Sequence, residues 1–86
     1  MKRDPNLLRS ILLLVEGLPT GYQPATLNFD GVDDETTSRH CQMLVRDGLL
    51  HLDKVIFTDG WAPGVLPGGL TFAGHDFLDG YRAGSA

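Results

Sequence analysis

The chain has 86 residues, of which 42% are hydrophobic and 21% charged, and its net charge is -4 at pH 7. This length supports one compact core, so we expect a single domain over residues 1–86. The single cysteine, Cys41, excludes an internal disulfide framework and favours a reducing, cytoplasmic setting. The negative net charge disfavours non-specific attraction to nucleic acid or to anionic lipid.

The N-terminal segment predicts a helix over residues 5–16 and no secretion signal. Asp4 is a suitable N-cap, Pro5 suits the first helical position, and Gly17 provides the stop. The apolar run at residues 11–15 is too short to span a bilayer, and no small-residue cleavage site follows it. We therefore expect neither a leader nor a membrane anchor. Residues 18–25 are predicted to form a loop.

One face of this first helix is predicted to lie in the core. The residues on that face are Leu7, Leu8, Ile11, Leu12 and Val15. Leu13 falls nearly opposite, on the solvent side, and Leu14 lies at the edge of the core arc. A surplus of apolar surface is typical of an interface, so Leu13 and Leu14 are predicted to contact a partner or a second copy in a homodimer.

The middle of the chain predicts a strand and then a second helix. Residues 26–29 alternate as a short half-buried strand does. A helix is expected from Asp33 to Asp47, with Gly48 as its cap. Its buried face is expected to carry Thr37, Cys41, Leu44 and Val45, and its exposed face Glu35, Arg39, Gln42 and Arg46.

The last part of the chain predicts a hairpin, or wing, and a third helix. Residues 49–52, 55–57 and 70–71 are strand-like, and the stretch 58–69 is a loop rich in glycine and proline. Thr71 is the expected cap of the third helix. Its buried side is predicted to hold Ala73, Phe77, Leu78 and Tyr81.

The order of elements predicts an α+β fold of winged-helix type, with three helices, a small antiparallel sheet and an extended wing. One feature departs from that pattern. Between Phe29 and Asp33 there is no room for the first helix of a helix-turn-helix pair. This absence weakens a DNA-binding interpretation and leaves the fold prediction unchanged.

Three segments carry a family resemblance. They are Met-Lys-Arg-Asp at residues 1–4 with the apolar residues that follow, His-Cys-Gln-Met-Leu at 40–44 running into Asp-Gly-Leu-Leu at 47–50, and Leu-Thr-Phe-Ala-Gly-His-Asp-Phe-Leu-Asp at 70–79. Together they resemble a family of short bacterial and prophage proteins of unknown function, and the closing segment is the most specific. The resemblance implies a winged-helix fold and a link to mobile elements, and it implies no established activity. Cys41 and the extended wing depart from the family pattern.

The side chains that could hold a metal ion or catalyse a reaction form no recognised motif. The candidates are His40, Cys41, His51, His75 and Asp76. Side chains of adjacent helical residues point about 100° apart, and no Cys-x-x-Cys or His-x-x-x-His spacing is present. We interpret Cys41 as a core residue and His75 as the partner of Asp79 on one helix face. The sequence therefore predicts no catalytic residue, no metal and no cofactor.

A nucleic-acid contact is one open interpretation of the second helix. The side chains that could make it are Ser38, Arg39, Gln42, Arg46 and, from the wing, Lys54. Residues 33–47, however, contain three Asp, one Glu and two Arg, a net charge of -2. The acidic residues gather at the start of the helix, where they would repel phosphate.

Trp61 lies in the glycine- and proline-rich loop, and two roles are open to it. An aromatic side chain in such a loop can anchor a partner, because it buries a large area at low entropic cost. It can also fold back over a small core, and we favour that role. We predict a non-enzymatic winged-helix interaction module, derived from a phage or prophage, that binds a protein partner or itself. The alternative is a DNA-binding transcriptional regulator.

Overall fold

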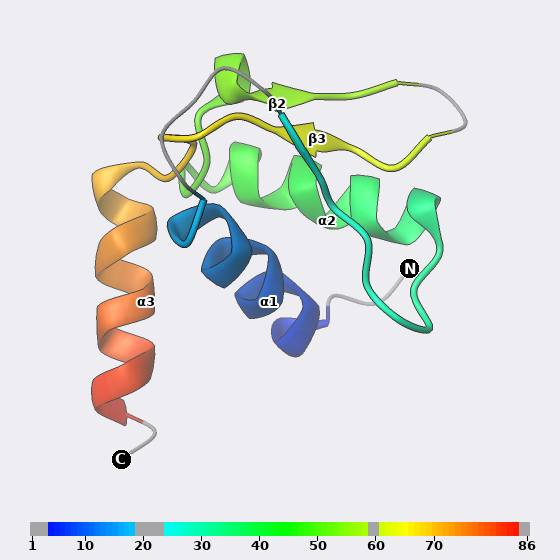
Figure 1. The fold of residues 1–86 in the computed structure, drawn as a ribbon. Coiled ribbons are helices and arrows are strands. Elements are labelled where there is room, and N and C mark those ends of the chain that lie inside the picture. The colour runs from blue at the N-terminus through cyan, green and yellow to red at the C-terminus, as the bar shows by residue number, and fades with distance from the viewer. Residues whose placement is uncertain (1–3, 19–23, 59–60, 85–86) are drawn as a thin grey trace.

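The computed structural model describes residues 4–18, 24–58 and 61–84, and it forms an α+β fold (Figure 1). The elements are α1 (Pro5–Glu16), β1 (Ala25–Thr26), α2 (Asp34–Arg46), the 3-10 turn η1 (Leu52–Lys54), β2 (Val55–Ile56), β3 (Gly64–Val65) and α3 (Phe72–Gly84). The predicted set of three helices and a small antiparallel sheet is confirmed. In the described part of the chain no helix has the length and apolar character needed to cross a bilayer.

Helix α1 forms where the sequence predicts it. The Asp4 carboxylate accepts the backbone N–H of Asn6 at 3.0 Å and that of Leu7 at 3.4 Å, so the N-cap is confirmed. The predicted core face is also confirmed, because all five of its residues are buried: Leu7, Leu8, Ile11, Leu12 and Val15. Of the loop predicted at residues 18–25, residues 19–23 lie outside the described part.

Helix α2 begins after Asp33, whose side chain accepts the backbone N–H of Thr36 at 3.1 Å. Its last helical residue is Arg46, and Gly48 reverses the chain with a φ of +78°, a conformation that glycine adopts without strain. The buried side chains include the predicted Thr37, Cys41 and Leu44, together with His40. Val45 was predicted to be buried and is half-buried.

The sheet has the strand order β1-β3-β2, and both pairs are antiparallel. Val65 at its centre pairs with Ala25 on one side and with Val55 on the other. All three strands are two residues long, so the sheet depends on the burial of a few apolar side chains. Val65 is fully buried and Val55 nearly so.

Strand β3 corrects the predicted wing. It lies inside the stretch 58–69 that the sequence predicts as loop, because glycine and proline residues on both sides of Val65 hide its strand character. The predicted strands at 49–52 and 70–71 contribute only a bridge between Leu50 and Leu70. The first strand is also shorter and earlier than predicted, at Ala25–Thr26. The hairpin therefore runs from β2 to β3 and is shorter than the predicted wing.

In Figure 1 the sheet, α2 and α1 form adjoining layers, and α3 stands at one end. The core cluster joins these layers through apolar side chains of α1, α2 and the sheet. Leu12, Leu27 and Leu44 are among its fully buried members. One face of α2 is thereby used for the core, and the opposite face is left to solvent.

Helix α3 is attached by a narrow face. Thr71 caps it as predicted, since its hydroxyl accepts the backbone N–H of Gly74 at 3.0 Å. Leu78 is buried, whereas the predicted core residues Ala73 and Phe77 are exposed. The prediction was wrong for these two because the helix approaches the domain through the bare backbone at Gly74, which leaves both flanks open. The side chain of Tyr81 lies outside the described part of the structure.

Candidate binding groove

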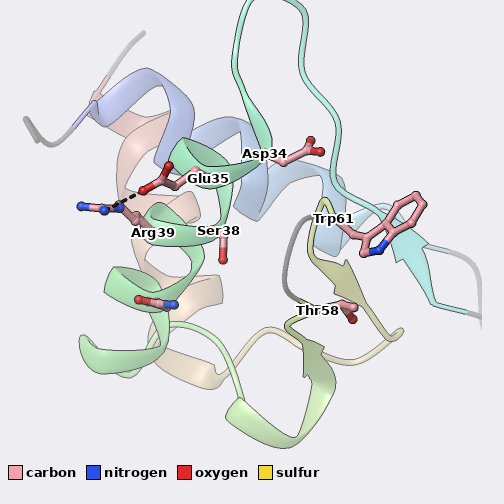
Figure 2. A pocket seen from close by; sticks show the side chains of 7 residues that line it. Asp34, Glu35, Ser38, Arg39, Thr58 and Trp61 are labelled. Carbon is pink, nitrogen blue, oxygen red and sulfur yellow. Dashed lines mark hydrogen bonds and ion pairs between the residues drawn. The ribbon is translucent and has the colours of Figure 1, made fainter.

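A groove with a volume of about 580 Å³ lies between the exposed face of α2 and the hairpin of β2 and β3 (Figure 2). The residues that line it are Asp34, Glu35, Ser38, Arg39 and Gln42 from α2, and Thr58 and Trp61 from the hairpin. Asp34, Ser38 and Gln42 follow each other at four-residue spacing, which places them on one face of the helix. Figure 2 shows Thr58 and Trp61 across the groove from Ser38.

A smaller hollow of about 260 Å³ continues along α2 toward its C-terminal end. It shares Arg39 and Gln42 with the groove and adds Met43 and Arg46. The two hollows together follow the exposed face of α2 over most of the helix. They bring together all four α2 residues that the sequence proposes as nucleic-acid contacts: Ser38, Arg39, Gln42 and Arg46.

Trp61 is 71% exposed, so the expectation that it folds back over the core was wrong. The core at this end is closed by Leu27, Pro63 and Val65, which are fully buried. The backbone N–H of Trp61 donates to the carbonyl oxygen of Thr58 at 3.1 Å, and both residues line the groove. The other role predicted for Trp61, contact with a partner, stays a prediction.

The charge of the groove is uneven along α2. Asp34 and Glu35 stand at its N-terminal end, and Arg46 stands at the far end of the neighbouring hollow. Asp33 adds to the acidic end, because hydrogen bonds from the side chain and the backbone of Thr36 lower the pKa of its carboxyl. Within the groove, Arg39 donates to the Glu35 carboxylate at 2.7 Å, so these two charges largely offset each other.

The remaining predicted contacts lie elsewhere. Lys54 is half-buried in η1 and lines neither hollow. Leu13 is 40% exposed on α1, as predicted, whereas Leu14 is half-buried and packs against the core. The apolar surplus on α1 is therefore smaller than the sequence indicates.

Three lining residues were not among the predicted contacts: Asp34, Glu35 and Thr58. The four-residue spacing from Asp34 to Ser38 is the signal that could have placed Asp34 on the same face. No spacing in the sequence indicates that Thr58 lines the groove, because its position depends on how the hairpin folds over α2.

The buried histidine of α2 is occupied by hydrogen bonds on both ring nitrogens. Nε2 of His40 accepts the backbone N–H of Asp4 at 3.0 Å, and Nδ1 lies 2.8 Å from the carbonyl oxygen of Thr36, to which it donates. Neither nitrogen is left for a metal ion. Burial raises the pKa of the neighbouring Cys41 thiol to about 12, so the metal-binding thiolate is disfavoured.

The other candidate ligands are dispersed over the surface. His51, His75 and Asp76 are all exposed. The Glu16 carboxylate of α1 lies 3.9 Å from Nδ1 of His75. The pairing of His75 with Asp79 stays a prediction. Among the residues that the structure describes, no three of His, Cys, Asp and Glu are grouped as a metal site would require.

Comparison with known proteins identifies a family and nothing closer. Residues 2–86 match the family described as "Hypothetical protein (DUF2513)". No curated protein matches the chain, and no solved structure does.

Proposed function

We propose that this chain, which belongs to the DUF2513 family of hypothetical proteins, is a non-enzymatic interaction module that binds a protein partner in the groove between α2 and the hairpin. The observation that carries the proposal is the exposure of Trp61 at the edge of this groove. Large aromatic side chains are the usual anchors of protein interfaces, because they bury much apolar area with few rotatable bonds. An exposed tryptophan beside a hollow is therefore suited to seat a partner.

The polar side chains around Trp61 support the same proposal. Ser38, Gln42 and Thr58 line the groove, and within the described residues their side chains form no hydrogen bond. Hydroxyl and amide groups can both donate and accept, so they suit the backbone and side chains of a partner segment. An aromatic anchor with a polar rim is the usual composition of a protein interface.

A DNA-binding regulator is the second candidate, because Arg39, Gln42 and Arg46 line adjoining hollows on one helix face. Two observations speak against it. Arg39 is paired with Glu35, and the carboxylate of Asp34 stands at the helix end that usually enters the major groove. Phosphate would meet negative charge at that end.

Four further parts of the proposal rest on other observations. A winged-helix relationship is supported by the order helix, strand, helix, hairpin, helix, with β3 at the centre of the sheet. Derivation from a phage or prophage and a cytoplasmic location rest on the resemblance of residues 70–79 and on the single cysteine. Self-association through α1 is supported by the exposure of Leu13.

Affinity capture from a lysate of the native host tests the proposal, with bound protein and bound nucleic acid identified in parallel. We expect the wild-type chain to retain a protein that Trp61→Ala loses. Phe72→Ala is the matched control, because Phe72 is a 93% exposed aromatic residue on α3, outside the groove. Equal loss from both variants, or recovery of sequence-selective nucleic acid that Arg39→Ala abolishes, would contradict the proposal.

A further inference from the structure

Among the described residues, the acidic end of the groove carries one carboxylate without a partner. Asp34 lines the groove beside Glu35, and Glu35 is held by Arg39 at 2.7 Å. In the part of the chain that the structure describes, the Asp34 side chain forms neither an ion pair nor a hydrogen bond. The groove therefore presents to its occupant one carboxylate that no side chain of the described residues pairs with.

Trp61 lines the same groove from the hairpin side, and Figure 2 shows the side chains of Asp34 and Trp61 at the same end of it. The face of an indole ring carries partial negative charge and attracts cations within about 6 Å of its centre. A carboxylate and an aromatic face in one hollow are thus complementary to the same kind of group, a positively charged side chain with an aliphatic stem.

We infer that the groove selects a lysine or arginine side chain of the partner protein and holds it between the Asp34 carboxylate and the Trp61 ring. This inference rests on the proposed function and names the chemistry of the partner segment. The side chains of Ser38 and Thr58, which form no hydrogen bond within the described residues, would receive the backbone on either side of the basic residue. The net charge of -4 favours approach of a basic segment.

The same observations disfavour the other occupants. A phosphate group would meet Asp34 and Glu35 at this end of the groove, so a nucleic acid or a phosphorylated peptide is opposed by charge. A purely apolar segment would leave the Asp34 carboxylate buried and unpaired, which is costly. A basic side chain satisfies both the ring and the carboxylate.

A titration with synthetic peptides tests this inference directly. The probes are a ten-residue glycine- and serine-based peptide containing three arginines, and the same peptide with citrulline in place of each arginine. Citrulline keeps the shape and removes the charge. Trp61 is the only tryptophan of the chain, so its fluorescence reports on the groove alone. We expect the arginine peptide to shift the Trp61 emission and to bind about fivefold more tightly than the citrulline peptide.

Two conservative variants assign the effect to the groove. Asp34→Asn should weaken binding of the arginine peptide about fivefold. Trp61→Phe should weaken it less, and because this variant lacks the fluorescent residue, its binding is measured from the amide chemical shifts of α2. Asp76→Asn is the control, because it removes an exposed carboxylate on α3. Circular dichroism melting confirms that each variant is folded.

A parallel titration with duplex DNA distinguishes a protein partner from a nucleic-acid partner. Asp34→Asn removes a negative charge, so it should weaken binding of the basic peptide, whereas it would strengthen binding of DNA. DNA binding that rises in this variant and exceeds peptide binding would overturn the inference and the proposed function together.

Equal binding of the two peptides, or an unchanged affinity in Asp34→Asn, would overturn only the inference. Capture of a protein that depends on Trp61 would in that case still support the groove as a docking site. If the captured protein were also indifferent to Trp61→Ala, the proposed function would fail as well.

Discussion

Nε2 of His40 accepts the backbone N–H of Asp4 at 3.0 Å, across 36 positions of the sequence. Asp4 is the N-cap of α1, and its side chain accepts the backbone N–H groups of the first turn. Its own backbone N–H is the group that donates to His40. The other ring nitrogen of His40 is fixed on the carbonyl oxygen of Thr36, one turn earlier in α2. The imidazole therefore joins the beginning of α1 to the middle of α2, and it does so in the neutral Nδ1–H tautomer.

Substitution of His40 by alanine should destabilise the fold. The side chain is 1% exposed, and its removal leaves a cavity and an unsatisfied N–H at Asp4. We expect His40→Ala to lower the free energy of unfolding by about 2–4 kcal/mol, measured by urea denaturation. His51→Ala is the control, because His51 is exposed, and it should change stability by less than about 0.5 kcal/mol. Similar losses from the two variants would contradict the role assigned to His40.

Gly74 and Gly80 of α3 should respond in opposite directions to substitution by alanine. A Cβ at Gly74 would lie against the carbonyl oxygen of Leu49 and 2.7 Å from the Leu70 side chain, so Gly74→Ala must push α3 away from the domain. We expect a loss of about 2–4 kcal/mol from this overpacking. A Cβ at Gly80 would meet nothing within 4 Å.

Gly80→Ala is therefore the matched substitution, made in the same helix without the contact. It should stabilise the protein by about 0.5–1 kcal/mol, because alanine favours the helix and restricts the unfolded chain. Thermal melting of both variants gives the comparison. A destabilised Gly80→Ala, or a neutral Gly74→Ala, would show that α3 is not attached through Gly74.

The sequence predicts the helices more reliably than the sheet for a physical reason. Helix α1 has a cap at Asp4 and a repeating apolar face, so local signals suffice to place it. Strand β3 has two residues, Gly64 and Val65, and its pairing with β1 and β2 depends on contacts distant in sequence. The groove follows the same division. Its α2 side was predicted from helical spacing, whereas the position of Trp61 opposite Ser38 depends on how the hairpin folds.

The buried thiol of Cys41 should make stability depend on pH in the alkaline range. Burial raises the pKa of this thiol from 9.0 to about 12, so the folded state keeps a proton that the unfolded state releases. The contribution of the protonated Cys41 thiol to the free energy of unfolding is fully present below pH 9 and is lost as the pH rises toward 12. The free energy of unfolding should fall by up to about 1.4 kcal/mol per pH unit in that range from this group.

Comparison with Cys41→Ala isolates this contribution, because lysine and tyrosine side chains titrate in the same range. Urea denaturation of both proteins between pH 8 and 10.5 should give the steeper decline in the wild type. The thiol of the folded wild type should also react slowly with a disulfide reagent at pH 8, since it is fully buried and protonated. Parallel declines in the two proteins would contradict the assignment.

Trp61 should contribute little to the stability of the isolated domain. Its ring is largely exposed, and the nearby core is closed by other residues, so Trp61→Ala should change the free energy of unfolding by less than about 0.5 kcal/mol. Leu27 is the contrasting residue, because it is fully buried and lies on the segment that joins β1 to α2. Leu27→Ala should cost about 2–5 kcal/mol. Tryptophan emission of the wild type, with acrylamide as quencher, gives a second measurement, and the ring should be quenched nearly as readily as a free indole. A cost of 3 kcal/mol or more for Trp61→Ala, with a shielded emission, would place the ring on the core and remove the anchor on which the docking site depends.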